Sequence, residues 1–144
     1  MKTVRDGSGR HYLLVKRSSD SSRVRDPRTG TERYLPTADL EIVDGQSALE
    51  TAATAVDPDV RRLVTAVHDD RGIGLLVEFV DRGPIPVVEL LDADDYCESD
   101  LHGLLTELRA AGLLVEADVG GQRGYDATES CERAVAQLRE SEPR

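Results

Sequence analysis

Aromatic residues, cysteine and lysine are all scarce in this chain of 144 residues. It contains one phenylalanine, no tryptophan and only two cysteines, Cys97 and Cys131. Two cysteines cannot build a disulfide framework, and no CxxC pair is present to hold zinc, so we expect both thiols to be reduced. No run of about 18 apolar residues is present, which argues against a membrane-spanning helix. The first residues lack the apolar core of a signal peptide, so we expect a cytoplasmic protein.

Acidic residues outnumber basic ones by 28 to 18, which gives a net charge of −10. Only two of the basic residues, Lys2 and Lys16, are lysines. An acidic, arginine-rich and lysine-poor composition is typical of salt-loving archaea, in which molar salt screens the repulsion between like charges. A GC-rich coding bias in a mesophile also replaces lysine by arginine. We favour a halophilic archaeon as the source.

The charge is distributed unevenly along the chain. Residues 1–36 contain nine bases and four acids, whereas residues 37–144 contain nine bases and 24 acids. The net charges of the two segments are therefore +5 and −15. Such asymmetry indicates that different surfaces have different roles.

The first segment, residues 1–45, is predicted to be a small, basic, antiparallel β module. Short strands are expected at 11–15, 22–25, 32–35 and 40–43, with a Pro-Gly turn at 26–30. Some of its basic residues are candidates for a nucleic-acid patch, since alternation in a strand places Arg23 and Arg25 on one face. This candidate patch consists of Lys16, Arg17, Arg23, Arg25, Arg28 and Arg33. Alternatively, the arginines pair with the acidic remainder of the chain and dock the module internally.

Residues 46–70 are predicted to form a helical connector. Ser47 and Glu50 have the spacing of a capping box, and Asp57-Pro58 is typical of a second helix start.

Residues 71–144 show a longer succession of helices and strands. Helices are expected at 73–82, 86–91, 98–111 and 128–140, with Asp94-Asp95 in a turn before the third helix. Strands are expected at 113–119 and 125–127, joined by the glycine-rich loop 120–124. The predicted order is thus three helices, a β-hairpin and a final helix.

The third predicted helix leads into the first strand through the segment Asp100-Leu101-His102-Gly103-Leu104-Leu105-Thr106-Glu107-Leu108-Arg109-Ala110-Ala111-Gly112-Leu113-Leu114. This segment and the order of the elements resemble winged helix-turn-helix transcriptional regulators of the ArsR and MarR kind. The resemblance covers about residues 72–140, and the whole chain is also similar to short helix-turn-helix proteins of haloarchaea. It implies an α+β fold with a C-terminal winged helix over 71–144, binding to double-stranded DNA, and a homodimer. The third helix is then expected to lie in the major groove.

The leucine spacing of the third helix predicts which residues read DNA. With the leucines inward, the outward face presents short polar residues and a glycine that permits close approach. Arg109 and Arg123 are positioned for contacts with the DNA backbone. Arg123 is expected to be the only charge at the tip of the wing and to contact either phosphate or the minor groove. The predicted DNA-binding residues are Ser99, His102, Gly103, Thr106, Arg109, Gln122 and Arg123.

Three acids, Glu98, Asp100 and Glu107, lie on or beside this reading face and favour an alternative function. The alternative is a protein-interaction adaptor, in which the winged helix binds protein and the β module contacts nucleic acid non-specifically. We expect no enzyme, cofactor or metal site, because the three histidines lie on different elements without metal-ligand spacing.

The last predicted helix carries an apolar stripe that consists of Cys131, Ala134, Val135 and Leu138. This stripe is expected either to pair with a second copy of the chain or to pack back on the chain's own helices. The connector helices are a second candidate for the dimer surface.

Overall fold

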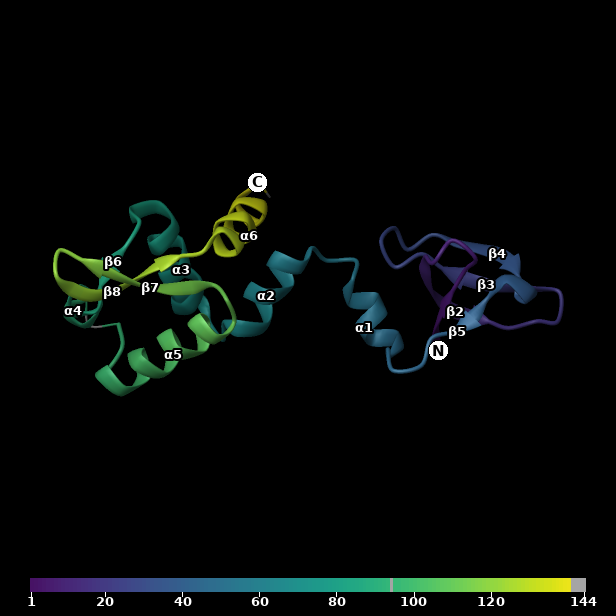
Figure 1. Cartoon of the computed structure of the whole chain (residues 1–144), viewed down its shortest axis with the longest axis horizontal. Coiled ribbons are helices and arrows are strands. Elements are labelled where there is room, and N and C mark those ends of the chain that lie inside the picture. Colours follow the sequence, from purple (N-terminus) through teal and green to yellow (C-terminus); the bar gives the residue numbers. More distant parts are fainter. Residues whose placement is uncertain (94, 141–144) are drawn as a thin grey trace. The chain divides into compact units, whose positions relative to one another are not determined.

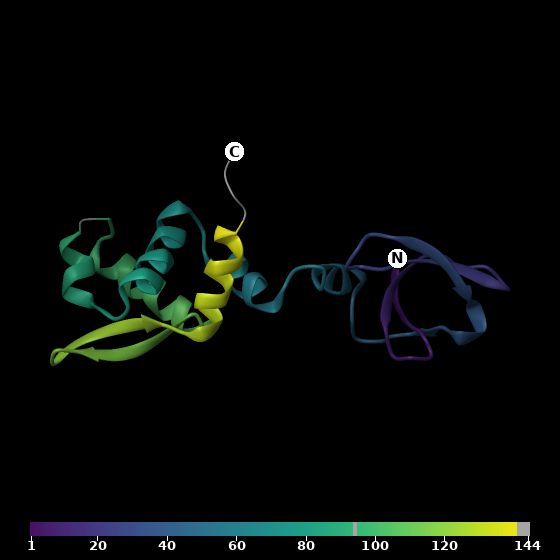
Figure 2. The same ribbon diagram turned by 90° about the horizontal axis from the view of Figure 1, so that it is seen from above.

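The computed structural model describes residues 1–93 and 95–140. It divides the chain into two compact units, Met1–Asp57 (unit 1) and Pro58–Arg144 (unit 2) (Figures 1 and 2). The predicted α+β class is confirmed: the described residues form an N-terminal antiparallel sheet and six α-helices. Asp94 and residues 141–144 of the predicted C-terminal domain lie outside the described residues. None of the helices in the described part of the chain has the length and apolar character needed to span a membrane.

Unit 1 contains a five-stranded antiparallel sheet in the order β4-β3-β2-β1-β5. Its elements are β1 (Lys2–Arg5), β2 (His11–Lys16), β3 (Ser21–Arg25), β4 (Glu32–Pro36), a 3₁₀ turn (Thr37–Asp39), β5 (Glu41–Ile42) and α1 (Ala48–Ala53). The sequence analysis missed β1, although this strand pairs with both β2 and β5. Val4 is the only large apolar residue of β1, so its alternation is not visible in the sequence.

A small apolar core lies on one face of this sheet. It consists of Val4, Tyr12 and Val24, each at most 2% exposed. On the opposite face, the hydroxyls of Thr3 and Thr51 share a hydrogen bond of 2.5 Å that joins β1 to α1. The predicted capping box begins α1, since the Ser47 hydroxyl accepts a hydrogen bond from the Glu50 N–H at 3.0 Å.

Unit 2 consists of five helices and a three-stranded sheet in the described residues. Its elements are α2 (Pro58–Ala66), α3 (Asp70–Arg82), β6 (Ile85–Pro86), α4 (Val87–Asp92), α5 (Glu98–Ala110), β7 (Leu114–Val119), β8 (Gln122–Ala127) and α6 (Glu129–Arg139). The strand order is β6-β8-β7, and Figures 1 and 2 show β7 and β8 as a two-stranded ribbon that leads from α5 to α6.

Two boundaries in unit 2 differ by three residues from the sequence prediction, and others differ by one residue. The helix expected from residue 73 begins at Asp70, because the Asp69 carboxylate caps it by accepting a hydrogen bond from the Gly72 N–H at 3.1 Å. The returning strand expected from residue 125 begins at Gln122. The predicted connector 46–70 is divided: α1 packs on β1 and β2 in unit 1, and α2 packs on α6 in unit 2.

The core of unit 2 is much larger than that of unit 1. It joins buried side chains from every helix and strand of the unit, and Leu76, Phe79, Leu101, Leu105 and Leu108 are all fully buried. Burial of the three α5 leucines fixes the rotation of this helix about its axis.

The apolar stripe of α6 packs on the chain's own helices. Cys131, Ala134 and Val135 are buried where α6 contacts α2 and α3, and of the four stripe residues only Leu138 is exposed, at 43%. For these three residues the structure therefore has the expected packing on the chain's own helices, and not the pairing with a second copy of the chain.

Polar contacts add to the packing of α6 on α2. Asp59 accepts hydrogen bonds from the Ser130 hydroxyl and from Arg133 Nε, each at 2.7 Å. These bonds hold the pKa of the Asp59 carboxyl below its ordinary value, and the bond from Arg133 has the largest effect.

Candidate nucleic-acid interface

Helix α5 presents a continuous polar face to solvent. Since Leu101, Leu105 and Leu108 are fully buried, the opposite side of the helix is exposed. The four predicted reading residues, Ser99, His102, Gly103 and Thr106, are all exposed and share this side of the helix. The structure thus brings these four residues together on one accessible surface.

The individual groups on this face differ in what they offer a ligand. The Thr106 hydroxyl donates to the His102 carbonyl at 2.8 Å, which leaves its oxygen lone pairs and its methyl group free for contacts. A Cβ added at Gly103 would meet no heavy atom within 4 Å, so the centre of the face is open to close approach. The face can therefore contact base edges or the backbone of a nucleic acid.

Acidic side chains flank this face. A Glu98 carboxylate oxygen lies 3.9 Å from His102 Nε2, and a Glu107 oxygen lies 3.1 Å from His68 Nε2. Both glutamates are exposed.

The two arginines predicted at the DNA backbone share one carboxylate. Arg109, in the last turn of α5, donates through Nη1 to Glu116 Oε1 at 2.8 Å. Arg123, on β8, reaches the same oxygen through Nη2 at 3.4 Å. Glu116 was not among the predicted residues, because only the pairing of β7 with β8 brings it next to Arg123.

Arg123 is also held by an aromatic side chain. Its guanidinium lies 5.9 Å from the centroid of the buried Tyr125 ring and donates to the Tyr125 hydroxyl at 3.2 Å. This hydrogen bond is the main reason that the pKa of Arg123 lies above its ordinary value. Arg123 thus contacts both Glu116 across the hairpin and Tyr125 on its own strand.

The tip of the hairpin differs from the prediction in two ways. The turn is only Gly120-Gly121, both with positive φ, as a two-residue hairpin turn of the primed kind requires. Asp118 lies opposite Arg123 in the register and accepts a hydrogen bond from the Gly121 N–H at 2.7 Å. Arg123 is therefore not the only charge at the tip, and Gln122 is the first residue after the turn.

Gly124 lies in β8 and not in the loop where it was expected. It is buried between β6 and β7, and an added Cβ would lie 2.5 Å from the Ile85 carbonyl oxygen. Glycine at this position permits the close approach of β6 to β8.

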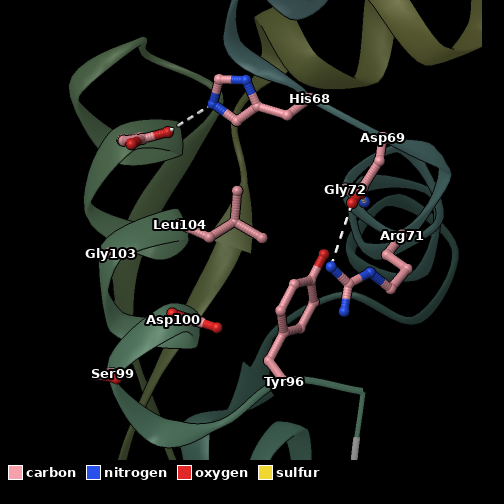
Figure 3. Close-up of a pocket in the computed structure, with 10 residues that line it drawn as sticks. His68, Asp69, Arg71, Gly72, Tyr96, Ser99, Asp100, Gly103 and Leu104 are labelled. Atoms are coloured by element: carbon pink, nitrogen blue, oxygen red, sulfur yellow. Dashed lines mark hydrogen bonds and ion pairs between the residues drawn. The ribbon is translucent and has the colours of Figure 1, made fainter.

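A groove of about 380 Å³ runs beside the reading face, between α5 and the start of α3 (Figure 3). Ser99 and Gly103 line it on the α5 side. On the other side the Arg71 guanidinium stacks on Tyr96 at 4.6 Å from the ring centroid and donates to the Asp95 carbonyl at 2.8 Å. The stack holds the residues that lead into α5, and no local sequence pattern relates Arg71 to Tyr96.

The structure does not bring the six candidate residues of the N-terminal patch onto one face. Arg23 and Arg25 share a face as predicted, and both form ion pairs with Glu32, at 3.4 and 2.9 Å. Arg33 lies on the other face, where it donates to the Tyr12 hydroxyl. Lys16 and Arg17 end β2 and begin the next loop, and Arg28 lies in the turn between β3 and β4.

Unit 1 extends 12 residues beyond the predicted basic module 1–45, and this extension adds two acids, Glu50 and Asp57. Between Met1 and Asp57 the chain has nine basic and nine acidic residues, so the unit carries no net charge. Within this unit Arg23 and Arg25 form ion pairs with Glu32, and Arg5 forms one with Glu41.

The two cysteines have different surroundings. Cys97 is exposed at the N-cap of α5, where it makes no side-chain capping bond. Cys131 is buried in α6, and burial raises the pKa of its thiol to about 11. Cys131 is thus a small core residue without thiolate reactivity at neutral pH.

Comparison with known protein families assigns the chain to one of them. The model of a family of unknown function, DUF7346, matches residues 1–139. The chain belongs to this family. No curated protein and no solved structure matches the chain.

The DUF7346 match includes both units and every residue of the candidate interface on α5, β7 and β8.

Proposed function

We propose that this DUF7346 protein is a DNA-binding transcriptional regulator, in which unit 2 is a winged helix-turn-helix domain that reads duplex DNA. The observation that carries the proposal is the order of elements from α3 to β8. Three helices, with β6 between the first two, precede a β-hairpin, and the strand order is β6-β8-β7. This is the arrangement expected of a winged helix, with α5 as the recognition helix and β7–β8 as the wing.

In this proposal α5 lies in the major groove with its polar face toward the bases. His102 and Thr106 are the side chains with hydrogen-bonding groups at the centre of the face, and Gly103 lets the helix backbone approach the groove. Ser99 lies in the first turn of α5, whose backbone N–H groups have no side-chain cap. Such a helix start can bind a phosphate.

Arg109, Gln122 and Arg123 supply backbone contacts from the end of α5 and from the wing. Contacts of this kind set the register of the protein on DNA and carry no sequence information. Because they are electrostatic, they weaken as salt increases.

We extend the proposal to a homodimer, since two copies of α5 would read two half-sites of a palindrome. Val64 on α2 and Leu138 on α6 are exposed, at 58% and 43%, and are the residues at which such a contact would be tested. Light scattering at working salt tests it: a dimer mass is expected, and a monomer mass contradicts it.

A second candidate function is a protein-interaction adaptor. It is favoured by the exposed acids Glu98, Asp100 and Glu107 on α5, because a DNA-reading helix gains affinity from positive charge. In that case the α5 face contacts a partner protein, and nucleic acid is bound without sequence preference.

A salt-titrated band shift with genomic fragments separates the two functions. A regulator is expected to retain particular fragments at salt that releases random duplex, and to protect defined positions in a footprint. Equal release of all fragments, with no footprint, would favour the adaptor.

A further inference from the structure

Two guanidinium groups from different elements converge on one oxygen atom at the base of the hairpin. Arg109 comes from the end of α5 and Arg123 from β8, and both contact Oε1 of Glu116, at 2.8 and 3.4 Å. All three side chains are at least half exposed, so the cluster lies open to solvent.

The fold itself produces this convergence. Glu116 pairs with Tyr125 across the hairpin, which places Arg123, two residues earlier on β8, diagonally opposite on the same face. Arg109 reaches the same point because α5 packs against β7. The contact of Arg123 with Tyr125 keeps its guanidinium near this point.

We infer that Arg109 and Arg123 together form a site for one backbone phosphate of DNA, and that Glu116 occupies this site in the free protein. The inference rests on the proposed DNA-binding function and adds an internal competitor to it. A phosphate oxygen takes the place of Glu116 Oε1 between the two guanidinium groups when DNA binds.

The exchange is physically reasonable because carboxylate and phosphate oxygens make the same charge-assisted hydrogen bonds to arginine. Exposed ion pairs contribute little to stability, so displacing Glu116 costs little. Glu116 competes by direct contact with both guanidinium groups, whereas Asp118 acts only as a charge near the site. Salt weakens both effects, because all of these side chains are exposed. Glu116 therefore lowers the affinity for DNA more than Asp118 does at the same salt concentration.

Asp118 provides a matched control. It lies two residues from Glu116 on the same strand and face, and its carboxylate caps the Gly121 N–H. No ion pair of Asp118 with an arginine is present in the described part of the chain. Asp118→Asn removes the same charge as Glu116→Gln but does not free the two arginines.

The test is fluorescence anisotropy of the full chain with a labelled random-sequence duplex, because phosphate contacts do not depend on sequence. Glu116→Gln is expected to tighten binding at least about threefold beyond Asp118→Asn at about 0.1 M salt. Both gains should become smaller as salt increases, because the groups are exposed. The comparison is therefore made at moderate salt, where binding to the random duplex is still measurable.

A variant that lacks both arginines, Arg109→Ala with Arg123→Ala, completes the design. In this background Glu116→Gln should have no effect beyond that of Asp118→Asn. The losses caused by the two arginine substitutions should be less than additive, because both contact one phosphate.

The possible failures are distinct. Equal gains from Glu116→Gln and Asp118→Asn, or a Glu116→Gln gain that survives without the arginines, would overturn the shared phosphate site while DNA binding stands. If neither the unaltered chain nor any variant binds duplex, the proposed function itself fails.

Discussion

The two units each hold a pair of arginines against one glutamate, but they differ in net charge and in the exposure of that pair. Unit 1 has as many basic as acidic residues, and Arg23 and Arg25 both form ion pairs with Glu32, whose side chain is 35% exposed. Unit 2 is acidic, with nine basic and 19 acidic residues, and Arg109 and Arg123 share Glu116, whose side chain is 50% exposed. The more open position of the second cluster is what makes it the candidate for binding an anion from outside the chain.

The units also differ in how much core supports them. Three buried side chains form the core cluster of unit 1, whereas seventeen form that of unit 2. Each core residue of unit 1 therefore carries a larger share of its stability.

The largest effect is expected from Tyr12→Ala in unit 1. Tyr12 is 1% exposed, and its hydroxyl accepts a hydrogen bond from Arg33. Removing a buried aromatic ring costs about 3–5 kcal/mol, comparable with the whole stability of a unit of this size. Two-dimensional NMR should show collapse of the unit 1 signals while those of unit 2 persist. Tyr34→Ala, at a 64% exposed tyrosine of β4, should leave both sets in place. Equal effects of the two substitutions would contradict this view of the core.

A pair of glycine substitutions tests the packing of unit 2. Gly124→Ala should destabilise it by about 1–3 kcal/mol, because the new methyl group clashes with the Ile85 carbonyl and forces β6 away from β8. Gly103→Ala should stabilise it by about 0.5–1 kcal/mol, because this glycine is exposed within α5 and its surroundings are open. The same Gly103 substitution should weaken DNA binding by hindering close approach. Chemical denaturation measures both stabilities, and effects of the same sign would refute the assignment of the two sites.

The smallest effect is a pH dependence at Asp59. Its pKa is lowered in the folded state, so the ionised carboxylate stabilises unit 2 above the unfolded pKa. This contribution is lost as the pH falls through the folded-state value, below about pH 4. Asp59→Asn should lower the melting temperature at pH 7. Between pH 5 and pH 3 the melting temperature of this variant should then fall less than that of the control Asp92→Asn, which removes a carboxylate from α4. Parallel pH curves for both variants would show that Asp59 does not link α2 to α6.

Local patterns in the sequence predict most of the elements. The capping residues Ser47 and Thr128 mark the starts of α1 and α6, and the leucine spacing predicts the buried side of α5. These features depend on residues within one or two helical turns of one another, so they can be recognised in the sequence.

Features that depend on pairing between distant segments are not predictable in this way. Strand β1 has too little apolar character to be recognised, and the need for glycine at position 124 arises only from the approach of β6. The role of Glu116 likewise requires both the hairpin register and the position of α5. The exposed face of the candidate site could be predicted, but the contacts that control its charge could not.

The central claim is that the polar face of α5 reads DNA sequence. It is tested by the ratio of affinities for a footprinted site and for random duplex, in the full chain and in the double variant His102→Ala, Thr106→Ala. Thr65→Ala is the matched control, since the Thr65 hydroxyl makes the same backbone contact on α2 as Thr106 makes on α5. The double variant should keep its melting temperature. Its affinity ratio should fall at least about tenfold, as expected when base contacts are removed. An unchanged ratio in the double variant would contradict the claim.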